Sequence, residues 1–392
     1  MVARGSKRNL LITMSGGTTS VINATLAGII KSAQASPGIN KIYAGYPGLV
    51  GALQEKFIDL TSYSPSQLSI IKESPGSASI GTTRVKIYDE KELSEVVQLF
   101  TSHDIGYFIN IGGNGTIRQT KSIASHCEDV SVCAAPKTVD NDLGDAQCEK
   151  MWYTPGFPSC VNYWYHKILM LDNENRGAST HDKVLIAQSF GRDTGFIVGS
   201  MRMADPQREL PLILLLPEDQ QDPDSILSKI EQVLVKHDRA IIGVSEGYKL
   251  GSRDLEYDLS GQPMYGSSKS MVAQELVGLC MENHIRARSY IPTIDQRQNF
   301  EHTLKSDIDV AHSLGEQIIK NFMKGERHFF QTYTRHGPNT IALDSICDFT
   351  RRMKSEWIDH ANYDVTSSYL SYLSSFVKTS PTRSLYAGGK FR

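Results

Sequence analysis

The stretch VSVCAAPKTVDND, residues 130–142, joins a short apolar run to a lysine and two aspartates. An apolar run that does not alternate with charged residues is typical of a parallel strand covered on both faces. Lys137, Asp140 and Asp142 follow directly, so their charges fall where this strand leaves the core. In open α/β sheets, ligands bind beyond the carboxyl ends of the strands. We therefore expect this strand end to carry function.

The same pattern recurs along the chain, and helical patterns lie between its repeats. Each further apolar run ends in glycine, proline or a charged residue, and these runs are residues 9–14, 41–46, 106–111, 183–190, 211–216 and 240–244. Residues 19–35 and 225–236 place their apolar side chains on one helical face. Strands that alternate with helices predict a doubly wound α/β fold. From about position 300 onward the sequence becomes more helical and polar.

Length and composition limit the class of protein. A chain of 392 residues suits two domains, and 40% hydrophobic with 21% charged residues supports a sizeable core. The net charge of −2 gives no bulk attraction to nucleic acid or to an anionic membrane. No zinc-binding motif and no membrane-length apolar run occurs in the sequence. We expect a soluble cytoplasmic protein whose six cysteines are reduced.

Two glycine-rich segments follow predicted strands. MSGGTTSVINA (14–24) and IGGNGTIRQT (111–120) each pass from a strand through glycines into a helix. Glycines let backbone N–H groups approach a phosphate, and the helix N-terminus adds partial positive charge. Neither segment matches a common nucleotide fingerprint, so each alone could be a tight strand-to-helix turn. Two such loops in one sheet favour a phosphate site.

The charged residues of PKTVDND can be interpreted together with these glycine-rich segments. Paired acids in a turn are ordinarily solvated caps. Next to a phosphate, however, Lys137 can pair with the anion, one carboxylate can take a hydroxyl proton, and the other can hold a metal. We favour this chemical interpretation.

Further charged residues follow other predicted strands. Arg192 lies in FGRDTGF (190–196) and suits charge that develops on a transferring phosphoryl group, although a surface arginine is the plainer alternative. Glu246 in SEGY (245–248) could bind sugar hydroxyls or be solvated. The segment RARSYIPTIDQR (286–297) is basic and could clamp a sugar phosphate or form a basic helix face.

In this order, the segments resemble the phosphofructokinase family, whose members use ATP or pyrophosphate. The matching segments are SGGTTSVINA, YAGYPGLVGAL, GTTR, GGNGT, PKTVDND, TPGF, FGRDTGF, SEGY and DQR. The resemblance implies two α/β domains with the active site between them. We expect the donor-phosphate domain to comprise residues 1–151 with about 296–345, and the sugar-phosphate domain residues 152–295 with about 346–392.

The resemblance also implies a reaction, in which magnesium assists phosphoryl transfer to the 1-hydroxyl of fructose 6-phosphate, as in glycolysis. Asp140 would be the base that takes the hydroxyl proton, and Thr138 would contact the transferred group. Asp142 would assist the metal together with Asn114. Arg192 would stabilise the transition state. The residues implied for the donor phosphates are Gly16, Arg84, Asn114, Gly115, Thr116 and Lys137.

The sugar phosphate is implied to lie against a second set of residues. These are Thr138, Asp140, Phe190, Gly191, Arg192, Glu246, Arg288 and Arg297, with Lys183. Lys183 stands where an arginine of the family often reaches across a subunit interface. The resemblance therefore implies a homodimer or homotetramer.

Three departures from the family pattern leave alternatives open. Asn114 replaces the usual acid of GGDG, Phe190 replaces the usual methionine, and QRQN replaces the QRGG of bacterial ATP users. The same chemistry on another sugar phosphate, such as sedoheptulose 7-phosphate, is one alternative. A catalytically silent regulatory homologue is the other.

The phosphoryl donor depends on two positions in the family. Pyrophosphate users usually carry Asp and Lys there and typical ATP users carry two glycines, whereas this chain has Gly115 and Lys137. An aspartate at 115 would repel the α-phosphate of ATP, and Gly115 imposes no such cost. Lys137 excludes neither donor, so the missing block at position 115 leads us to expect a slight preference for ATP over pyrophosphate. The segments QRQN and GRDTGF look more like those of pyrophosphate users.

Overall fold

The computed structural model describes residues 7–74, 79–251, 256–257, 263–265, 271–345 and 350–379. The chain divides into two units. Unit 1 comprises Met1–Cys160, Leu255–Met264 and Arg297–Arg351, and unit 2 comprises Val161–Asp254, Tyr265–Gln296 and Arg352–Arg392. Within the described ranges, no helix is both long and apolar enough to span a membrane.

Unit 1 is built on a seven-stranded sheet with the order β11-β10-β5-β4-β1-β2-β3. Its strands are β1 (Arg8–Met14), β2 (Ile39–Gly45), β3 (Phe57–Asp59), β4 (Ile105–Gly112), β5 (Ser131–Pro136), β10 (Phe329–Thr334) and β11 (Gly337–Ala342). The five inner strands are parallel, and the edge strands β3 and β11 pair antiparallel with their neighbours.

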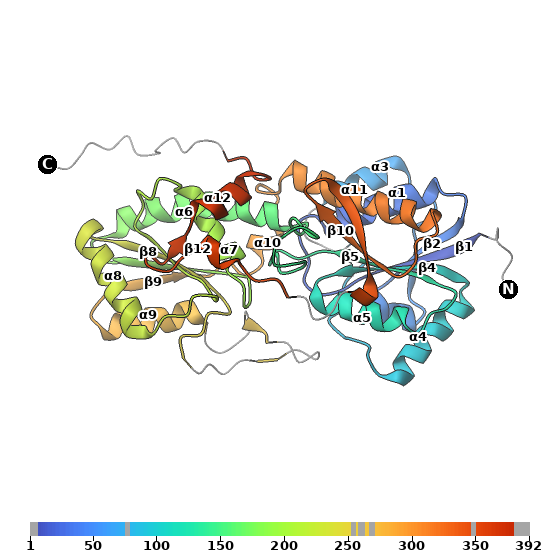
Figure 1. Cartoon of the computed structure of the whole chain (residues 1–392), viewed down its shortest axis with the longest axis horizontal. Coiled ribbons are helices and arrows are strands. Elements are labelled where there is room, and N and C mark those ends of the chain that lie inside the picture. The colour runs from blue at the N-terminus through green and yellow to red at the C-terminus, as the bar shows by residue number, and fades with distance from the viewer. Residues whose placement is uncertain are drawn as a thin grey trace. The chain divides into compact units, whose positions relative to one another are not determined.

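Helices cover both faces of this sheet (Figure 1). They are α1 (Ile22–Gln34), α2 (Gly48–Leu53), α3 (Pro65–Glu73), α4 (Glu90–Ser102), α5 (Asn114–Ala124) and α11 (Lys305–Met323), with a short 3₁₀ turn η3 (Leu343–Ser345). Successive side chains of β1 point to opposite faces, so Leu10 and Ile12 pack under α1 and α11 while Leu11 packs under α4 and α5. The continuous apolar run is therefore the result of two buried faces.

Unit 2 has a smaller parallel sheet with the order β7-β8-β6-β9. Its strands are β6 (Val184–Ser189), β7 (Leu212–Leu215), β8 (Ala240–Ser245) and β9 (Ala287–Tyr290). The accompanying helices are α6 (Phe157–Ala178), which begins in unit 1, α7 (Phe196–Ser200), η1 (Met201–Ala204), α8 (Pro223–His237), α9 (Val272–Glu282) and α10 (Asp295–Gln298), which ends in unit 1. Helix α8 begins with Asp222 accepting a bond from the Ser225 N–H, which satisfies a donor of its first turn.

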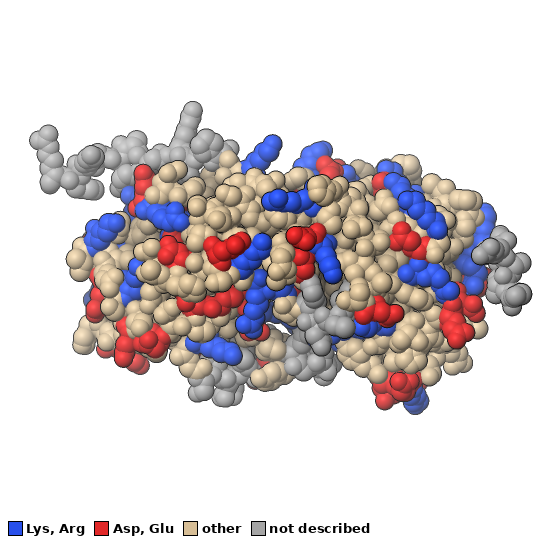
Figure 2. Space-filling model, viewed as in Figure 1, with Lys and Arg blue, Asp and Glu red and all other residues tan. Residues whose placement is uncertain are grey.

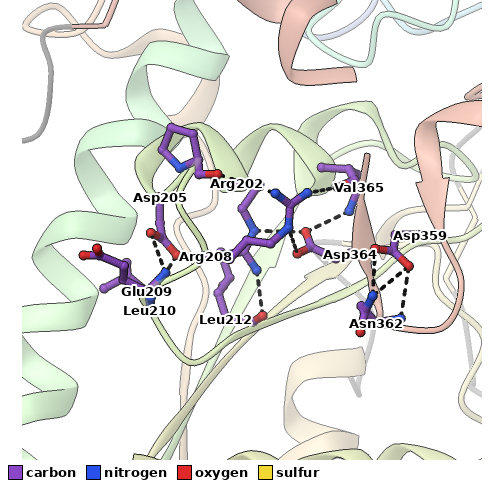
Figure 3. Close-up of polar contacts among 11 residues, drawn as sticks. Arg202, Asp205, Arg208, Glu209, Leu210, Leu212, Asp359, Asn362, Asp364 and Val365 are labelled. Carbon is purple, nitrogen blue, oxygen red and sulfur yellow. Dashed lines mark hydrogen bonds and ion pairs between the residues drawn. The ribbon is translucent and has the colours of Figure 1, made fainter. Parts of the chain in front are cut away.

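The described C-terminal segment, residues 350–379, contains η4 (Ser355–Trp357), β12 (Ile358–Asp359), β13 (Asp364–Val365) and α12 (Ser367–Ser374). A buried ion-pair network joins it to the rest of unit 2 (Figure 3). Arg202, with 2% of its side chain exposed, pairs with Asp364 at 3.0 Å and with Asp205 at 2.8 Å. Its remaining contact is a bond to the Leu212 carbonyl at 2.8 Å.

The predicted α/β class is confirmed, and each predicted apolar run forms a strand. The C-terminal residues are less helical than expected, because β10 and β11 extend the sheet of unit 1. Strand β11 (GPNTIA) is an edge strand with little apolar character, and β9 (ARSY) is a four-residue edge strand that carries a charge. These two edge strands are partly exposed and lack an apolar run, whereas the edge strand β7 (LILL) is buried along its length and has one.

The Arg202 network predicts a large cost for removing one partner. Asp364→Asn leaves the buried guanidinium without one of its two countercharges, so we expect a loss of about 3–5 kcal/mol in the free energy of unfolding, measured with urea. Glu356→Gln removes an exposed pair with Lys354 at 3.7 Å and serves as the control, with an expected loss below about 1 kcal/mol. Equal losses in the two variants would contradict the structural role of the network.

Candidate active site

Three loops leave neighbouring strands at one edge of the unit 1 sheet. Strands β1, β4 and β5 are adjacent and parallel, and their register aligns Met14 with Ile111 and Gly112 with Pro136. The two glycine loops and the PKTVDND segment therefore emerge side by side, as the positions of their strands predicted. On the face shown in Figure 2, basic and acidic side chains are interspersed. Binding of an anion would therefore depend on individual basic groups, such as those of these loops.

A lysine that the sequence interpretation missed joins the two glycine loops. The half-buried Lys86 donates from Nζ to Ser15 Oγ at 2.6 Å and to Thr116 Oγ1 at 3.1 Å. Its segment is tied to the first loop, because the Gly16 N–H donates to the Thr83 carbonyl at 2.9 Å. The GTTR segment pointed to this place, but only the exposed Arg84 was chosen from it.

Lys137 brings a second ammonium group to the first glycine loop. Only 4% of this residue is exposed, and its Nζ donates to the Gly17 carbonyl. A Cβ built on Gly16, whose φ is +83°, would lie 3.6 Å from the same Nζ. This ammonium adds positive charge at the first glycine loop, which suits the binding of an anion there.

The second glycine loop begins α5. Gly113 is its N-cap residue, Asn114 is its first residue, and Gly115 and the buried Thr116 follow in the first turn. The Tyr88 hydroxyl donates to the Gly115 carbonyl at 3.2 Å. The Thr116 N–H donates to the Gly113 carbonyl at 2.9 Å, and the partial positive charge of the helix N-terminus makes this end suited to anions.

The two aspartates of PKTVDND lie in different settings. Asp140 is half-buried, and its Oδ2 accepts from Thr138 Oγ1 at 3.2 Å while its N–H donates to the same hydroxyl oxygen at 3.1 Å. Asp142 is 7% exposed and its Oδ2 accepts from Asn114 Nδ2 at 2.7 Å. The structure thus brings together both residues predicted to hold a metal.

This pair fits magnesium only in part. No group of three His, Cys, Asp or Glu side chains that could hold a metal occurs among the described residues. Mg²⁺ commonly takes one or two carboxylates together with substrate phosphates and water. One carboxylate from Asp142 and one amide group from Asn114 match that mode, in which the substrate supplies the remaining charge.

Asn141, between the two aspartates, fixes their directions. It is fully buried in the left-handed conformation, with φ at +57°, and Thr154 N–H donates to its Oδ1 at 3.0 Å. Arg351, 2% exposed, donates from Nε to the Asn141 carbonyl at 2.9 Å and from Nη2 to its Oδ1. Its backbone N–H reaches the Asp142 carbonyl at 2.8 Å. Sequence reasoning missed Arg351 because nothing local links position 351 to position 141.

Asp307 supports the other side of the same segment. Thr138 forms an isolated bridge with Gly156 of the TPGF turn, and Thr154 Oγ1 donates to the Thr138 carbonyl at 2.8 Å. The fully buried Asp307 accepts from Gly156 N–H at 3.1 Å and from Ser159 Oγ at 2.6 Å. It thereby supplies, from α11, the acceptor that the first turn of α6 requires. Burial raises the pKa of Asp307 to about 6.

The carboxyl edge of the unit 2 sheet holds Arg192 and Glu246. Strands β6 and β8 end in register, with Ser189 opposite Ser245. The exposed Arg192 has a φ of +50°, and Ser245 Oγ donates to its carbonyl at 2.9 Å. Glu246 is 7% exposed and follows β8 directly. An arginine held in the left-handed region is strained, which is typical of a functional position.

Phe190 and Gly191 begin the same loop. Gln296 Oε1 accepts from the Phe190 N–H at 2.8 Å and from Trp164 Nε1 at 3.2 Å. Gly191 has a φ of +127° and its carbonyl accepts from the Thr194 N–H at 2.9 Å. These bonds define the start of the turn that presents Arg192.

Three predicted sugar-phosphate residues lie elsewhere. Lys183 precedes β6 and pairs with Asp238 at 2.5 Å. Arg288, in β9, pairs with Asp182 at 2.7 Å near the same amino end of the sheet, opposite to the Arg192 end. Arg297 belongs to unit 1, where a Cβ built on Gly17 would lie 2.5 Å from its Nη1. Unit 2 therefore does not bring Lys183 and Arg288 to its own Arg192 edge.

Two α/β units whose parallel strands end in glycine loops and paired acids define a class of doubly wound proteins with polar sites at the sheet edges. The chain belongs to the phosphofructokinase family, whose model matches residues 9–322. A pyrophosphate–fructose 6-phosphate 1-phosphotransferase from Rhodospirillum rubrum is 28% identical over 388 residues, which cover 94% of this chain and 93% of its own.

Solved structures agree with this assignment. A pyrophosphate-dependent phosphofructokinase from Nitrosospira multiformis has a TM-score of 0.84 at 26% identity, covering 95% of this chain and 92% of its own. An ATP-dependent 6-phosphofructokinase from Trypanoplasma borreli is 28% identical over 262 residues, which cover only 65% of this chain and 50% of its own.

The expected preference for ATP is wrong. Four relatives that are 25–28% identical over 81–97% of this chain, and the Nitrosospira multiformis structure, carry names that specify pyrophosphate. The error lay in treating Gly115 as decisive, because the absence of a repulsive carboxylate permits ATP without creating affinity for it. Lys137 adds positive charge at the first glycine loop, which favours a compact donor of high negative charge.

Asp307 predicts a specific pH dependence of stability. Its pKa of about 6 in the folded chain lies above the ordinary value of 3.8, so its protonated form stabilises the fold at low pH. That contribution is lost as the pH rises through about 6. Relative to Asp307→Asn, the wild-type free energy of unfolding should therefore fall by about 2 kcal/mol between pH 4 and pH 7. Asp309→Asn, on the exposed side of α11, corrects for the change in net charge. A pH-independent difference would contradict the raised pKa.

Proposed function

We propose that the chain is a magnesium-dependent phosphotransferase that moves a phosphoryl group from pyrophosphate to the 1-hydroxyl of fructose 6-phosphate. The observation that carries this proposal is the placement of Lys137 and Lys86 at the two glycine loops, the second of which contacts Asp142 through Asn114. Two ammonium groups and a helix N-terminus suit a compact donor of high negative charge. The names of the most similar relatives support the same donor and acceptor.

Asp140 acts as the general base in the proposed reaction. Its carboxylate takes the proton of the sugar 1-hydroxyl as the hydroxyl oxygen forms a bond to phosphorus. The bridging P–O bond of pyrophosphate breaks at the same time, and orthophosphate leaves with the electron pair of that bond. Thr138 is hydrogen-bonded to Asp140 and orients the carboxylate. Arg192 stabilises the negative charge on the transferring group.

Magnesium, when bound, neutralises charge on the donor phosphates and orients them for in-line transfer. Asp142 and Asn114 would hold it from the protein side, where they contact each other at 2.7 Å. Gly16, Gly115, Thr116 and Arg84 complete the donor site around the two lysines. In this arrangement, much of the negative charge that holds the metal comes from pyrophosphate itself.

The sugar phosphate binds through residues from more than one subunit. Glu246, Arg297, Phe190 and Gly191 belong to the proposed pocket. Lys183 and Arg288 lie at the opposite end of the unit 2 sheet from Arg192, so they serve the site of a neighbouring subunit. The proposed enzyme is therefore a homodimer or homotetramer.

A second candidate keeps the chemistry and changes the acceptor to another sugar phosphate. Phe190 favours it, because this bulky aromatic side chain replaces the methionine usual in the family at the start of the Arg192 loop. A panel of sugar phosphates with pyrophosphate as donor separates the two candidates by kcat/KM.

Asp140→Asn tests the base. The amide keeps the shape of the carboxylate but cannot accept the proton, so kcat should fall by about 10²–10⁴-fold while the KM for fructose 6-phosphate changes little. Asp145→Asn, which removes another charge shortly after the PKTVDND segment, is the comparison for general effects of a lost carboxylate. A variant with near-normal turnover would exclude Asp140 as the base.

Lys86→Met tests the donor site. Loss of a charge-assisted contact costs about 1.5–3 kcal/mol, so kcat/KM for pyrophosphate should fall by about 10–100-fold. Lys91→Met, at an exposed position in α4, should leave kcat/KM for pyrophosphate unchanged.

Wild-type kcat/KM should be higher with pyrophosphate than with ATP. A higher value with ATP would overturn the proposed donor.

A further inference from the structure

Glu218 lies behind the loop that presents Arg192. It follows β7, and its Oε1 accepts from the Gly195 N–H at 3.1 Å and from the Met353 N–H at 3.0 Å. Gly195 ends the loop and begins α7, whereas Met353 belongs to the C-terminal segment 350–379. One carboxylate oxygen thus joins two parts of unit 2 that are far apart in sequence.

The contact is tightly packed. A Cβ built on Gly195 would lie 2.8 Å from Glu218 Oε2 and 2.9 Å from Met353 Sδ. Oε2 itself is buried and has no hydrogen-bond partner among the described residues. Burial raises the pKa of Glu218. A buried carboxylate with one unsatisfied oxygen is costly, which argues that its two backbone bonds serve a purpose beyond stability.

The Arg192 loop is short and is held by hydrogen bonds at its start, its middle and its end. Thr194 Oγ1 closes the turn on the Gly191 carbonyl at 2.9 Å, and Ser245 Oγ holds the Arg192 carbonyl from the side of β8. The Glu218 bond fixes the far end, three residues after Arg192. Because Arg192 is in the strained left-handed region, each of these contacts opposes relaxation of the loop.

The C-terminal segment is itself firmly anchored. Asp364 pairs with the buried Arg202, and the Tyr369 hydroxyl donates to the Phe196 carbonyl in α7 at 2.5 Å. Figure 3 shows the first of these anchors, with Arg202 directed toward Asp364. The segment also lies beyond residues 9–322, the part of the chain that the family model matches.

We propose that Glu218 is a positioning residue for phosphoryl transfer. By holding the Gly195 and Met353 N–H groups together, it braces the Arg192 loop against the C-terminal segment and so sets the direction of the Arg192 guanidinium. This inference rests on the proposed function, because it requires Arg192 to act on the transferring phosphoryl group.

A double-mutant cycle between Glu218 and Arg192 tests the inference. Glu218→Ala should lower kcat by about 10–100-fold, since a small misplacement of a reacting group costs up to about 10²-fold, and should leave the KM for pyrophosphate within about twofold. Glu218→Gln keeps an oxygen that can accept from both N–H groups, so its kcat should stay within about threefold of the wild-type value. In an Arg192→Ala background, adding Glu218→Ala should change kcat by less than about threefold, because its effect passes through Arg192.

The outcomes separate the inference from the proposed function. If Glu218→Ala lowers kcat by the same factor with and without Arg192, or does not lower it at all, the positioning role is overturned and the proposed function stands. If Arg192→Ala itself keeps near-normal kcat, the proposed role of Arg192 falls and the inference falls with it. If Glu218→Ala does not fold, Glu218→Asp takes its place in the double-mutant cycle, because it shortens the side chain by one methylene and moves the carboxylate away from both N–H groups. Thermal unfolding of every variant identifies losses that arise from instability.

Discussion

The register of three adjacent parallel strands is the constraint on which the rest of the unit 1 site depends. Because β1, β4 and β5 align Met14 with Ile111 and Gly112 with Pro136, their carboxyl ends stop at one level. Two glycine loops and two aspartates are thereby concentrated at one edge of the sheet. A slip of one residue in this pairing would turn alternate side chains to the other face and scatter the loops.

Buried polar contacts from distant parts of the chain then hold the PKTVDND segment, which the strands only bring to the sheet edge. Arg351 holds Asn141 between the two aspartates, and Asp307 holds the turn that pairs with Thr138. Unit 2 uses the same principle, since Glu218 and the C-terminal segment support the Arg192 loop. Buried polar groups therefore define such a site as much as its surface charges do. Removal of one partner from these buried contacts is costly.

Much of this arrangement could be predicted from the sequence. Apolar runs marked the strands that are buried on both faces, including the edge strand β7, and the position of PKTVDND after such a run placed its charges at the carboxyl edge. What escaped prediction is long-range. Lys86 bridges two loops, Arg351 reaches back 210 residues to Asn141, and Asp307 serves a helix that begins 150 residues earlier at Phe157. The donor was misjudged for another reason, because Gly115 shows only that ATP could fit, and the positive charge of Lys137 was given too little weight.

The central claim is that pyrophosphate gives one phosphoryl group to the 1-hydroxyl of fructose 6-phosphate. Phosphorus NMR of the purified chain with magnesium, pyrophosphate and fructose 6-phosphate follows every phosphorus atom in this reaction. The account predicts that the pyrophosphate signal decays while orthophosphate and a new phosphomonoester on carbon 1 grow in equal amounts. Conversion of pyrophosphate into two orthophosphates with an unchanged sugar, or no decay of pyrophosphate at all, would contradict it.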